Sequence, residues 1–135
     1  NSVAVHVRRG DYLLVNKYEN LCNTNYYQNA LCYLRERLSN LKIYIFSDDI
    51  KYCRELEFFP PDAVFVDFND GTSAYEDMFL MSQANSIVLA NSTFSWWSGY
   101  LGNHDYVLRP AKYLKNWSQK DDYALFPEEW IKIPL

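Results

Sequence analysis

Short apolar runs of strand length alternate with helical patterns along most of this sequence. Strands are predicted at residues 2–7, 42–47, 63–68, 86–90 and 106–109. Helices are predicted between them, from Asn23 or Thr24 to about Leu38, from Asp48 or Asp49 to near Phe58, from about Tyr75 to Ala84, and from Thr93 to about Leu101. This alternation is typical of a parallel sheet covered by helices. The sequence therefore predicts an α/β fold, a Rossmann-like parallel sheet with helices on both faces.

The chain has the length of a single domain, 135 residues. Its tail beyond Pro110 carries Trp117 and Trp130 but shows no clear pattern, and we expect it to pack across the outside of the sheet. The sequence begins directly on a strand pattern. We therefore expect one domain, residues 1–135, taken from a longer protein.

Neither a membrane span nor a disulfide framework is indicated by the sequence. The longest apolar stretch lies around residues 87–90, far short of the ~20 residues that a span requires. Cys22, Cys32 and Cys53 form an odd set without metal-like spacing, which favours a reduced, cytoplasmic protein. Cys32 falls in a helical pattern and is expected to be a small buried apolar residue.

The formal net charge is −4, and it argues against broad nucleic-acid binding, which relies on a positive surface. It does not exclude a single nucleotide, because two well-placed cations can hold a pyrophosphate. The local sign of the charge therefore matters more than the total.

Ligands of open parallel sheets gather at the carboxyl ends of the strands. In this sequence that rule marks residues 8–11, 47–49, 68–73 and 91–95. The third segment contains a loop, residues 69–73, with strong turn chemistry. All of the motifs considered below lie on or just after these strand ends.

Residues 6–12 (HVRRGDY) combine two arginines, a histidine and a glycine at the end of the first strand. The planar fork of an arginine suits a phosphate, and glycine lets the backbone turn closely beside it. Period-two geometry places His6 and Arg8 on one face and Arg9 on the other. We expect Arg8 to face the ligand and Arg9 to brace the loop through a carboxylate, and both are candidate substrate-binding residues. His6 alone would more often be a core histidine.

Residues 90–97 (ANSTFSWW) predict a strand that runs into a helix whose first turn carries three hydroxyls. Unpaired amides and the positive end of the helix dipole favour an anion there. Thr93 and Ser95 are candidate phosphate contacts. Plain N-capping by Ser92 or Thr93 is the alternative, and it accounts for only one of the hydroxyls.

Three aspartates are candidate contacts with other parts of a nucleotide. Asp77 could accept two hydrogen bonds from guanine, although a dipole-favoured acid in the first turns of a helix is the simpler interpretation. Asp48 and Asp49 could contact ribose hydroxyls, with helix capping as the default. As a metal signal they are weak, because no partner ligand stands at recognisable spacing. His104 is interpreted as a surface residue.

At these residues the sequence resembles the α-1,2-fucosyltransferases of glycosyltransferase family 11. The likeness is carried by residues 6–12 and 90–97, with support from residues 45–49, 76–78 and 126–131. The fold of the family resembles two Rossmann-like domains facing across a cleft, the GT-B arrangement. This chain looks like the carboxyl-terminal, GDP-fucose-binding domain, without the amino-terminal domain that supplies much of the acceptor site.

The resemblance implies an inverting, metal-independent transfer of fucose from GDP-fucose to a glycan acceptor, with α-1,2 linkage to galactose. It implies that Arg8 grips the β-phosphate beside His6, that Asp77 reads guanine, and that Thr93 and Ser95 line the phosphate side. Asp11 is the nearest candidate for a general base, and a salt bridge that orders the loop is an equal alternative. Peripheral membrane association is also expected.

Two other classes of function stay open at this point. A transferase for a different nucleotide sugar would keep the arginine and helix-terminus features but would not need Asp77. A non-catalytic nucleotide-binding or interaction module would need only exposed loops.

Overall fold

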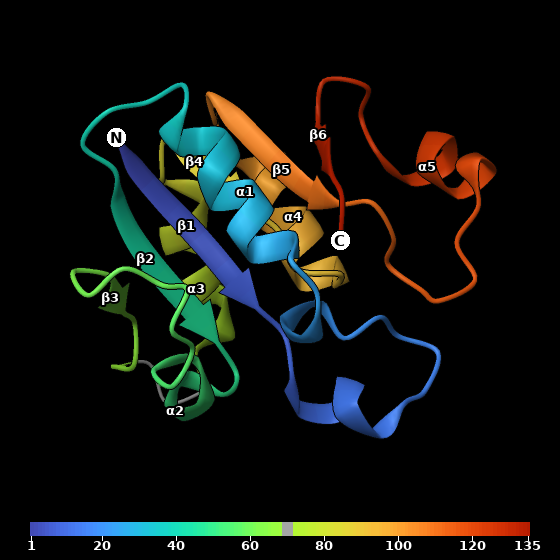
Figure 1. Ribbon diagram of the computed structural model, residues 1–135, viewed down its shortest axis with the longest axis horizontal. Coiled ribbons are helices and arrows are strands. Elements are labelled where there is room, and N and C mark those ends of the chain that lie inside the picture. The colour runs from blue at the N-terminus through green and yellow to red at the C-terminus, as the bar shows by residue number, and fades with distance from the viewer. Residues whose placement is uncertain (69–71) are drawn as a thin grey trace.

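The computed structural model describes residues 1–68 and 72–135, and in them the chain forms one six-stranded sheet with every pair of neighbours parallel. The strands are β1 (Ser2–Val7), β2 (Lys42–Ser47), β3 (Val64–Phe65), β4 (Ser86–Val88), β5 (Tyr106–Pro110) and β6 (Ile131–Ile133). Their order is β3-β2-β1-β4-β5-β6, so the chain builds outward from β1 in one direction and then from β4 in the other (Figure 1). The confirmed fold class is the Rossmann-like parallel sheet.

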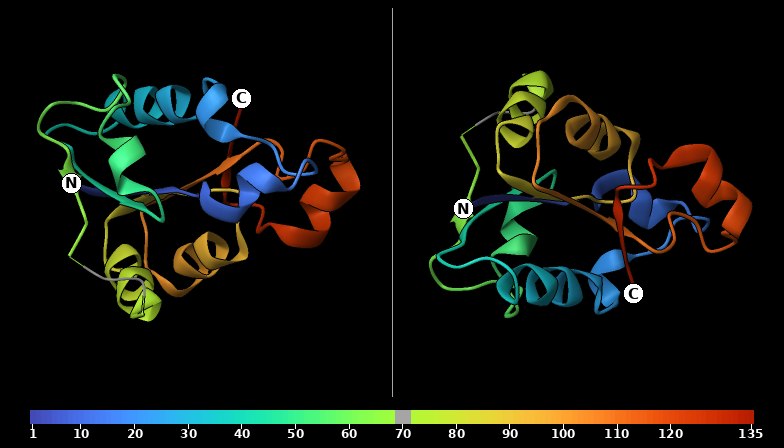
Figure 2. Two further views of the ribbon diagram at one scale, coloured as in Figure 1. Left: turned by 90° about the horizontal axis from the view of Figure 1, so that it is seen from below. Right: turned by 90° about the horizontal axis from the view of Figure 1, so that it is seen from above.

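Helices cover both faces of this sheet. They are α1 (Tyr26–Arg35), α2 (Ile50–Cys53), α3 (Ala74–Ser82), α4 (Thr93–Leu101) and α5 (Gln119–Leu125), with short 3-10 turns at Gly10–Leu14 and Leu21–Asn23. Figure 2 shows α1 and α2 on one face and α3 and α4 on the other, with α5 beyond the β6 side of the sheet. The change of face between α2 and α3 coincides with the reversal of strand order, because β4 pairs with β1 rather than with β3.

Alternation along β1 divides the core into two layers, as predicted. Val3, Val5 and Val7 are buried with the apolar residues of α1. Ala4 lies in the opposite layer, and the His6 ring packs on that side against Phe94. Because successive side chains of a strand point to opposite faces, Arg8 and Arg9 leave β1 in different directions.

Several predicted elements are shorter in the structure, including β4, which ends at Val88 rather than at residue 90, and α1, which spans Tyr26–Arg35 rather than reaching Leu38. β3 ends at Phe65, although the strand pattern runs to Phe68. It is an edge strand of the described sheet, and among the described residues after Phe65 only Val66 continues the pairing, by donating its amide to the Ile45 carbonyl. α2 ends at Cys53 because the turns that follow are tighter than those of an α-helix. The Glu55 amide donates to the Tyr52 carbonyl, and the Leu56 amide donates to the Cys53 carbonyl. The predicted turn at residues 69–73 lies partly outside the described residues.

The tail was the largest error of the sequence analysis. It does not simply cross the outside, because β6 adds a sixth strand beside β5, and Trp130 is buried. Polar contacts as well as apolar packing attach the tail to the sheet. The Asp122 carboxylate accepts hydrogen bonds from Arg109 at 2.9 Å, Trp117 at 2.8 Å and Lys132 at 2.6 Å. A three-residue strand and a polar seven-residue helix gave too little periodicity to be recognised.

Two single-residue expectations were also wrong. Cys32 is exposed, because it lies one position past the buried Leu31 on α1, while Cys53 is the buried cysteine. His104 is half-buried rather than a surface residue, with Nδ1 2.7 Å from the Ala84 carbonyl oxygen and Nε2 3.2 Å from that of Ser98. All three cysteines are free thiols.

None of the helices in the described parts of the chain has the length and hydrophobicity to cross a bilayer. The cytoplasmic location and the peripheral membrane association stay predictions.

Candidate functional site

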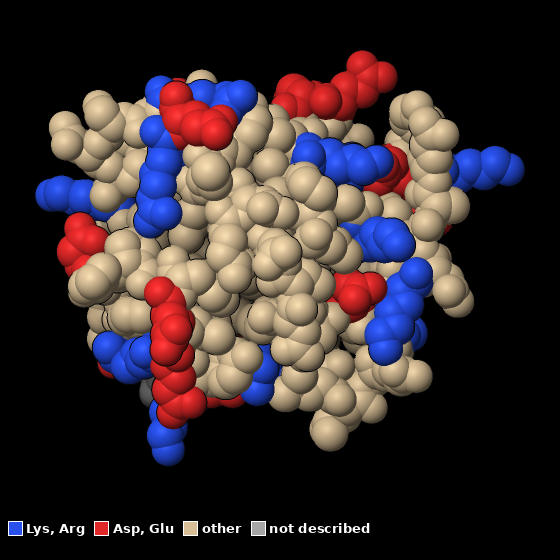
Figure 3. Space-filling view, viewed as in Figure 1, with Lys and Arg blue, Asp and Glu red and all other residues tan. Residues whose placement is uncertain are grey.

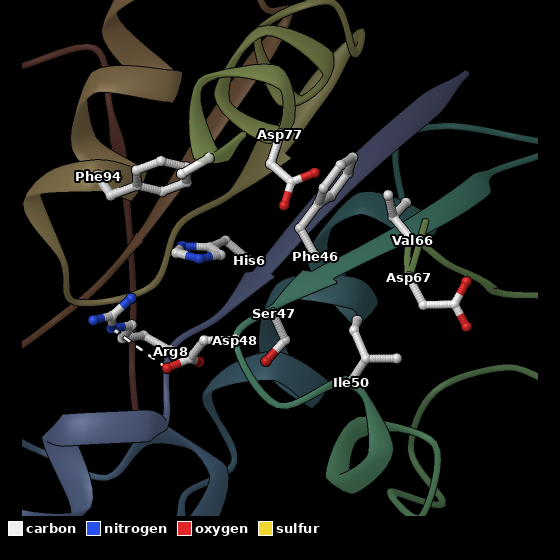
Figure 4. A pocket seen from close by; sticks show the side chains of 11 residues that line it. His6, Arg8, Phe46, Ser47, Asp48, Ile50, Val66, Asp67, Asp77 and Phe94 are labelled. Atoms are coloured by element: carbon white, nitrogen blue, oxygen red, sulfur yellow. Dashed lines mark ion pairs between the residues drawn. The ribbon is translucent and has the colours of Figure 1, made fainter. Parts of the chain in front are cut away.

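A cavity of about 470 Å³ opens at the carboxyl ends of the first three strands. Its lining comes from β1, β2, the segment after β3, and the first turns of α3 and α4: His6, Arg8, Phe46, Ser47, Asp48, Ile50, Val66, Asp67, Ala74, Asp77 and Phe94. Figure 4 shows these side chains surrounding one opening. The cavity lies beside the boundary between β1 and β4, where the strand order reverses and sheets of this topology bind their ligands.

His6 is the most deeply buried polar side chain of the cavity. The residue is 4% exposed, and its ring lies between Arg8 and the Phe94 ring, whose centroid is 5.4 Å away (Figure 4). Burial, and secondly the charge of Arg8, lowers the pKa of His6 from 6.5 to about 3. The imidazole is therefore neutral at pH 7. Its Nδ1 atom is buried and has no hydrogen-bond partner among the described residues.

Arg8 stands beside His6 between two carboxylates. Its Nη2 atom donates to Asp11 Oδ1 at 2.8 Å, and its Nε atom lies 3.7 Å from Asp48 Oδ2. That Nε atom is buried and makes no hydrogen bond with the residues that the structure describes. Asp11 lies at the rim, since its side chain is 64% exposed and does not line the cavity. The guanidinium is thus positioned in advance and keeps an unused donor.

Arg9 leaves the strand on the opposite side. Its Nε atom donates to Asp49 Oδ2 at 3.2 Å, and its guanidinium carbon lies 3.2 Å from the centroid of the Tyr52 ring. Asp49 also caps α2 by accepting from the Tyr52 amide. Both residues therefore lie outside the cavity lining, and a contact of Arg9 or Asp49 with a ligand stays a prediction.

Gly10 allows the loop to close on Asp48. A Cβ atom at this position would lie 2.2 Å from Asp48 Oδ2, so a larger residue would have to displace that carboxylate. Asp48 Oδ1 in turn accepts from the Arg9 amide at 2.9 Å. The carboxylate therefore joins β2 to the loop after β1 and still lines the cavity.

Asp77 lies on the other side of the cavity, in the first turn of α3. In Figure 4 its carboxylate points toward the opening, next to the ring of Phe46 and away from Arg8. The cavity thus has Arg8, beside the Asp48 carboxylate, toward one end and Asp77 toward the other, with apolar rings between them. That arrangement suits a ligand with an anionic group at one end and hydrogen-bond donors at the other.

The first turn of α4 uses two of its three hydroxyls internally. Ser92 Oγ accepts from the Ser95 amide at 3.1 Å, and the buried Ser95 Oγ accepts from the Ala90 amide at 2.8 Å. Thr93 is exposed and does not line the cavity, whereas Phe94 does. The phosphate contacts of Thr93 and Ser95 stay predictions.

Several lining residues were missed by the sequence analysis: Phe46, Ile50, Val66, Asp67, Ala74 and Phe94. Most of them follow the strand ends that the sequence marked, but apolar residues at such positions look like ordinary core. Only the cavity that forms in the folded chain distinguishes them.

Metal ligands do not gather anywhere in residues 1–68 and 72–135, because no group of three or more His, Cys, Asp or Glu side chains there could hold an ion. The metal independence of the chemistry stays a prediction.

Curated relatives match nearly the whole chain. An α-1,2-colitosyltransferase of Escherichia coli is 39% identical over 142 aligned residues, covering 98% of this chain and 48% of the relative. A galactoside α-(1,2)-fucosyltransferase 1 of Ateles belzebuth is 31% identical, covering 97% of this chain and 38% of the relative. The chain therefore spans about half the length, or less, of these relatives.

A crystal structure of the fucosyltransferase NodZ from Bradyrhizobium superimposes with a TM-score of 0.48 at 19% identity, covering 76% of this chain and 36% of NodZ. The sequence model described as Glycosyl transferase family 11 matches residues 1–134. This chain belongs to glycosyltransferase family 11.

Proposed function

We propose that this chain binds GDP-fucose in the cavity described above and forms the donor-binding domain, residues 1–135, of an inverting α-1,2-fucosyltransferase. The observation that carries the proposal is the polarity of the cavity, with Arg8 and neutral His6 at one end and Asp77 at the other. A nucleoside diphosphate has the matching polarity. The names of the relatives support the linkage, since both describe α-1,2 transfer.

Arg8 is the residue that meets the leaving group. As the bond from the sugar to the β-phosphate breaks, negative charge grows on that phosphate, and a guanidinium held in place stabilises it without reorganisation. The unused Nε donor of Arg8 and the neutral imidazole of His6 supply further contacts. Losing one such contact costs about 3 kcal/mol of barrier, or roughly a hundredfold in rate.

Asp11 has two tasks in this proposal. Its ion pair with Arg8 orients the guanidinium, and its exposed carboxylate accepts the proton of the acceptor hydroxyl once phosphate has engaged Arg8. Asp11→Asn separates the tasks in the full-length enzyme. A lost base lowers the transfer rate and leaves GDP affinity nearly unchanged, whereas a purely orienting role lowers both.

Guanine recognition is assigned to Asp77. A carboxylate accepts hydrogen bonds from both N1–H and the 2-amino group of guanine, which adenine and uracil cannot offer together. We expect the chain to bind GDP more tightly than ADP or UDP, and Asp77→Asn to remove most of that preference. Titration calorimetry with the three nucleotides measures it, and Glu76→Gln, one position away on α3, is the control.

Two outcomes would contradict this assignment. Equal affinity of the wild type for the three nucleotides would mean that the chain does not recognise guanine. Unchanged selectivity in Asp77→Asn would mean that another residue recognises it. The same titration with EDTA tests metal independence, for which unchanged GDP affinity is expected.

A different sugar on the donor is the second candidate function, and the 39% identity to an α-1,2-colitosyltransferase favours it. The nucleotide contacts of the cavity would serve either sugar. Transfer assays of the full-length enzyme with both donors decide between them. A non-catalytic module, the remaining alternative, would show no nucleotide preference.

A further inference from the structure

A second cavity, of about 360 Å³, lies next to the first. We name it the Tyr12 pocket. Its lining includes Tyr12, Asn16, Tyr18, Glu19, Asn23 and Lys115. The Tyr12 ring separates it from the first cavity, because the Arg8 guanidinium carbon lies 5.4 Å from the centroid of that ring. A ligand in the Tyr12 pocket would therefore be a neighbour of anything held by Arg8.

The frame of the Tyr12 pocket is built from two segments that are far apart in sequence. Tyr18 forms an antiparallel bridge with Leu114, and the Lys115 amide donates to the Lys17 carbonyl at 3.0 Å. The buried amide of Asn91 donates to the carbonyls of Glu19 and Tyr113, each at 2.9 Å. These contacts join the two segments that line the pocket.

Tyr12 and Tyr18 form the wall toward the first cavity. Their rings stack with centroids 3.9 Å apart, and Arg8 and Lys17 cover the outer faces. Burial, and secondly the neighbouring Tyr18, raises the pKa of Tyr12 to about 12, so its phenol stays protonated and can both donate and accept a hydrogen bond.

Polar side chains in the Tyr12 pocket keep unused hydrogen-bonding capacity. Within the described residues, the Glu19 carboxylate and the Asn23 amide have no hydrogen-bond or ion-pair partner, and both line the pocket. Lys115 is engaged, since its Nζ atom donates to Asn16 Oδ1 at 2.6 Å. Acceptors and donors thus face the pocket together, and its described lining carries one cation, Lys115, and one carboxylate, Glu19.

We propose that the Tyr12 pocket holds a sugar ring of the acceptor glycan. Mixed donors and acceptors suit hydroxyl groups, each of which both donates and accepts, better than they suit a phosphate, which needs free cations. The pocket is adjacent to the proposed donor site, because Tyr12 lines the pocket and the Arg8 guanidinium lies over the Tyr12 ring. This inference rests on the proposed function, because it supplies the acceptor side of the same reaction.

The test is an NMR titration of the isotopically labelled chain with lactose, a galactoside, in the presence of GDP. We expect lactose to shift the amide signals of Tyr18, Glu19, Asn23 and Lys115. Glu19→Gln removes the charged acceptor and keeps the shape, so it should weaken lactose binding by about tenfold. Asn23→Ala is a second variant, at a more exposed position, and Glu36→Gln, at the C-cap of α1, is the matched control.

Shifts confined to another surface, or lactose affinity that survives both variants, would overturn the inference, as would the absence of lactose binding by the folded wild type. GDP shifting the same amides would make the pocket a nucleotide site instead. The affinity for GDP distinguishes a failure of the acceptor-pocket inference from a failure of the proposed function. It should be unchanged in Glu19→Gln, whereas a chain that binds no GDP contradicts the donor proposal itself.

Discussion

His6 shows how a single residue combines stability with binding. A buried imidazole with a pKa near 3 is neutral in the folded chain, whereas it titrates with a pKa of 6.5 when the chain unfolds. Its place beside Arg8 leaves the neutral ring as a partner for an anion. The cost of that placement is sensitivity to acid, because the folded state resists the proton that the unfolded state accepts.

The pH dependence of unfolding tests this description of His6. Between pH 6.5 and 3 the unfolded chain binds more protons at this site, so stability falls as the pH falls through that window. From pH 7 to pH 5 the loss from His6 alone is about 2 kcal/mol. Urea unfolding at the two pH values measures it, and His6→Phe should lose less stability than the wild type by about that amount. Equal losses would mean that His6 does not resist protonation.

Individual elements differ in how well the sequence predicted them. The bounds of β1, β2 and α4 came out as expected, because β-branched runs and a Ser92 cap are strong local signals. β6 was missed because its three residues form a strand only when β5 offers an edge. The pairing with β5 is a tertiary contact, so the local sequence pattern does not predict it.

Some features of the candidate site were likewise predictable from the sequence, and others were not. The direction of Arg8 and Arg9 followed from strand periodicity alone. The internal roles of Ser92 and Ser95 could not be predicted. The same sequence allows a hydroxyl at a helix start either to hydrogen-bond within the turn or to bind a ligand. The apolar wall at Phe94 was hidden for a related reason, since its aromatic ring suits a core equally well.

The attachment of β6 depends on one buried carboxylate. Burial raises the pKa of Asp122, but hydrogen bonds from Lys132, Trp117 and Arg109 outweigh it, and the pKa is lowered. Asp122→Ala would leave the buried Arg109 without its counter-charge, at a cost of about 3–5 kcal/mol. Urea unfolding measures the loss, with Glu129→Ala as an exposed control in the same segment.

Hydrogen exchange adds a local readout to this test. The Ala111 amide donates to the Ile133 carbonyl across the β5–β6 junction, so it should exchange faster in Asp122→Ala. Stability within about 0.5 kcal/mol of the wild type, with unchanged exchange at Ala111, would show that apolar packing alone holds β6.

At the scale of the whole molecule, topology brings the functional groups together. The order β3-β2-β1-β4-β5-β6 places the polar strand ends at one edge of the sheet, and both cavities open next to Arg8. Figure 3 shows acidic and basic side chains interspersed on the visible face rather than gathered into one field. The net charge of −4 therefore does not oppose an anion at a site whose local charge is set by a few residues.

The measurement that tests the central claim most directly is the affinity of the chain for GDP, by titration calorimetry, in wild type, Arg8→Ala and Arg37→Ala. The last variant removes an exposed arginine that follows α1 and does not line the cavity. We predict that Arg8→Ala weakens GDP binding by at least about 30-fold, because a charge-assisted contact to phosphate is worth about 2 kcal/mol or more, and that Arg37→Ala has no effect. Equal GDP affinity in wild type and in a folded Arg8→Ala variant would contradict the account.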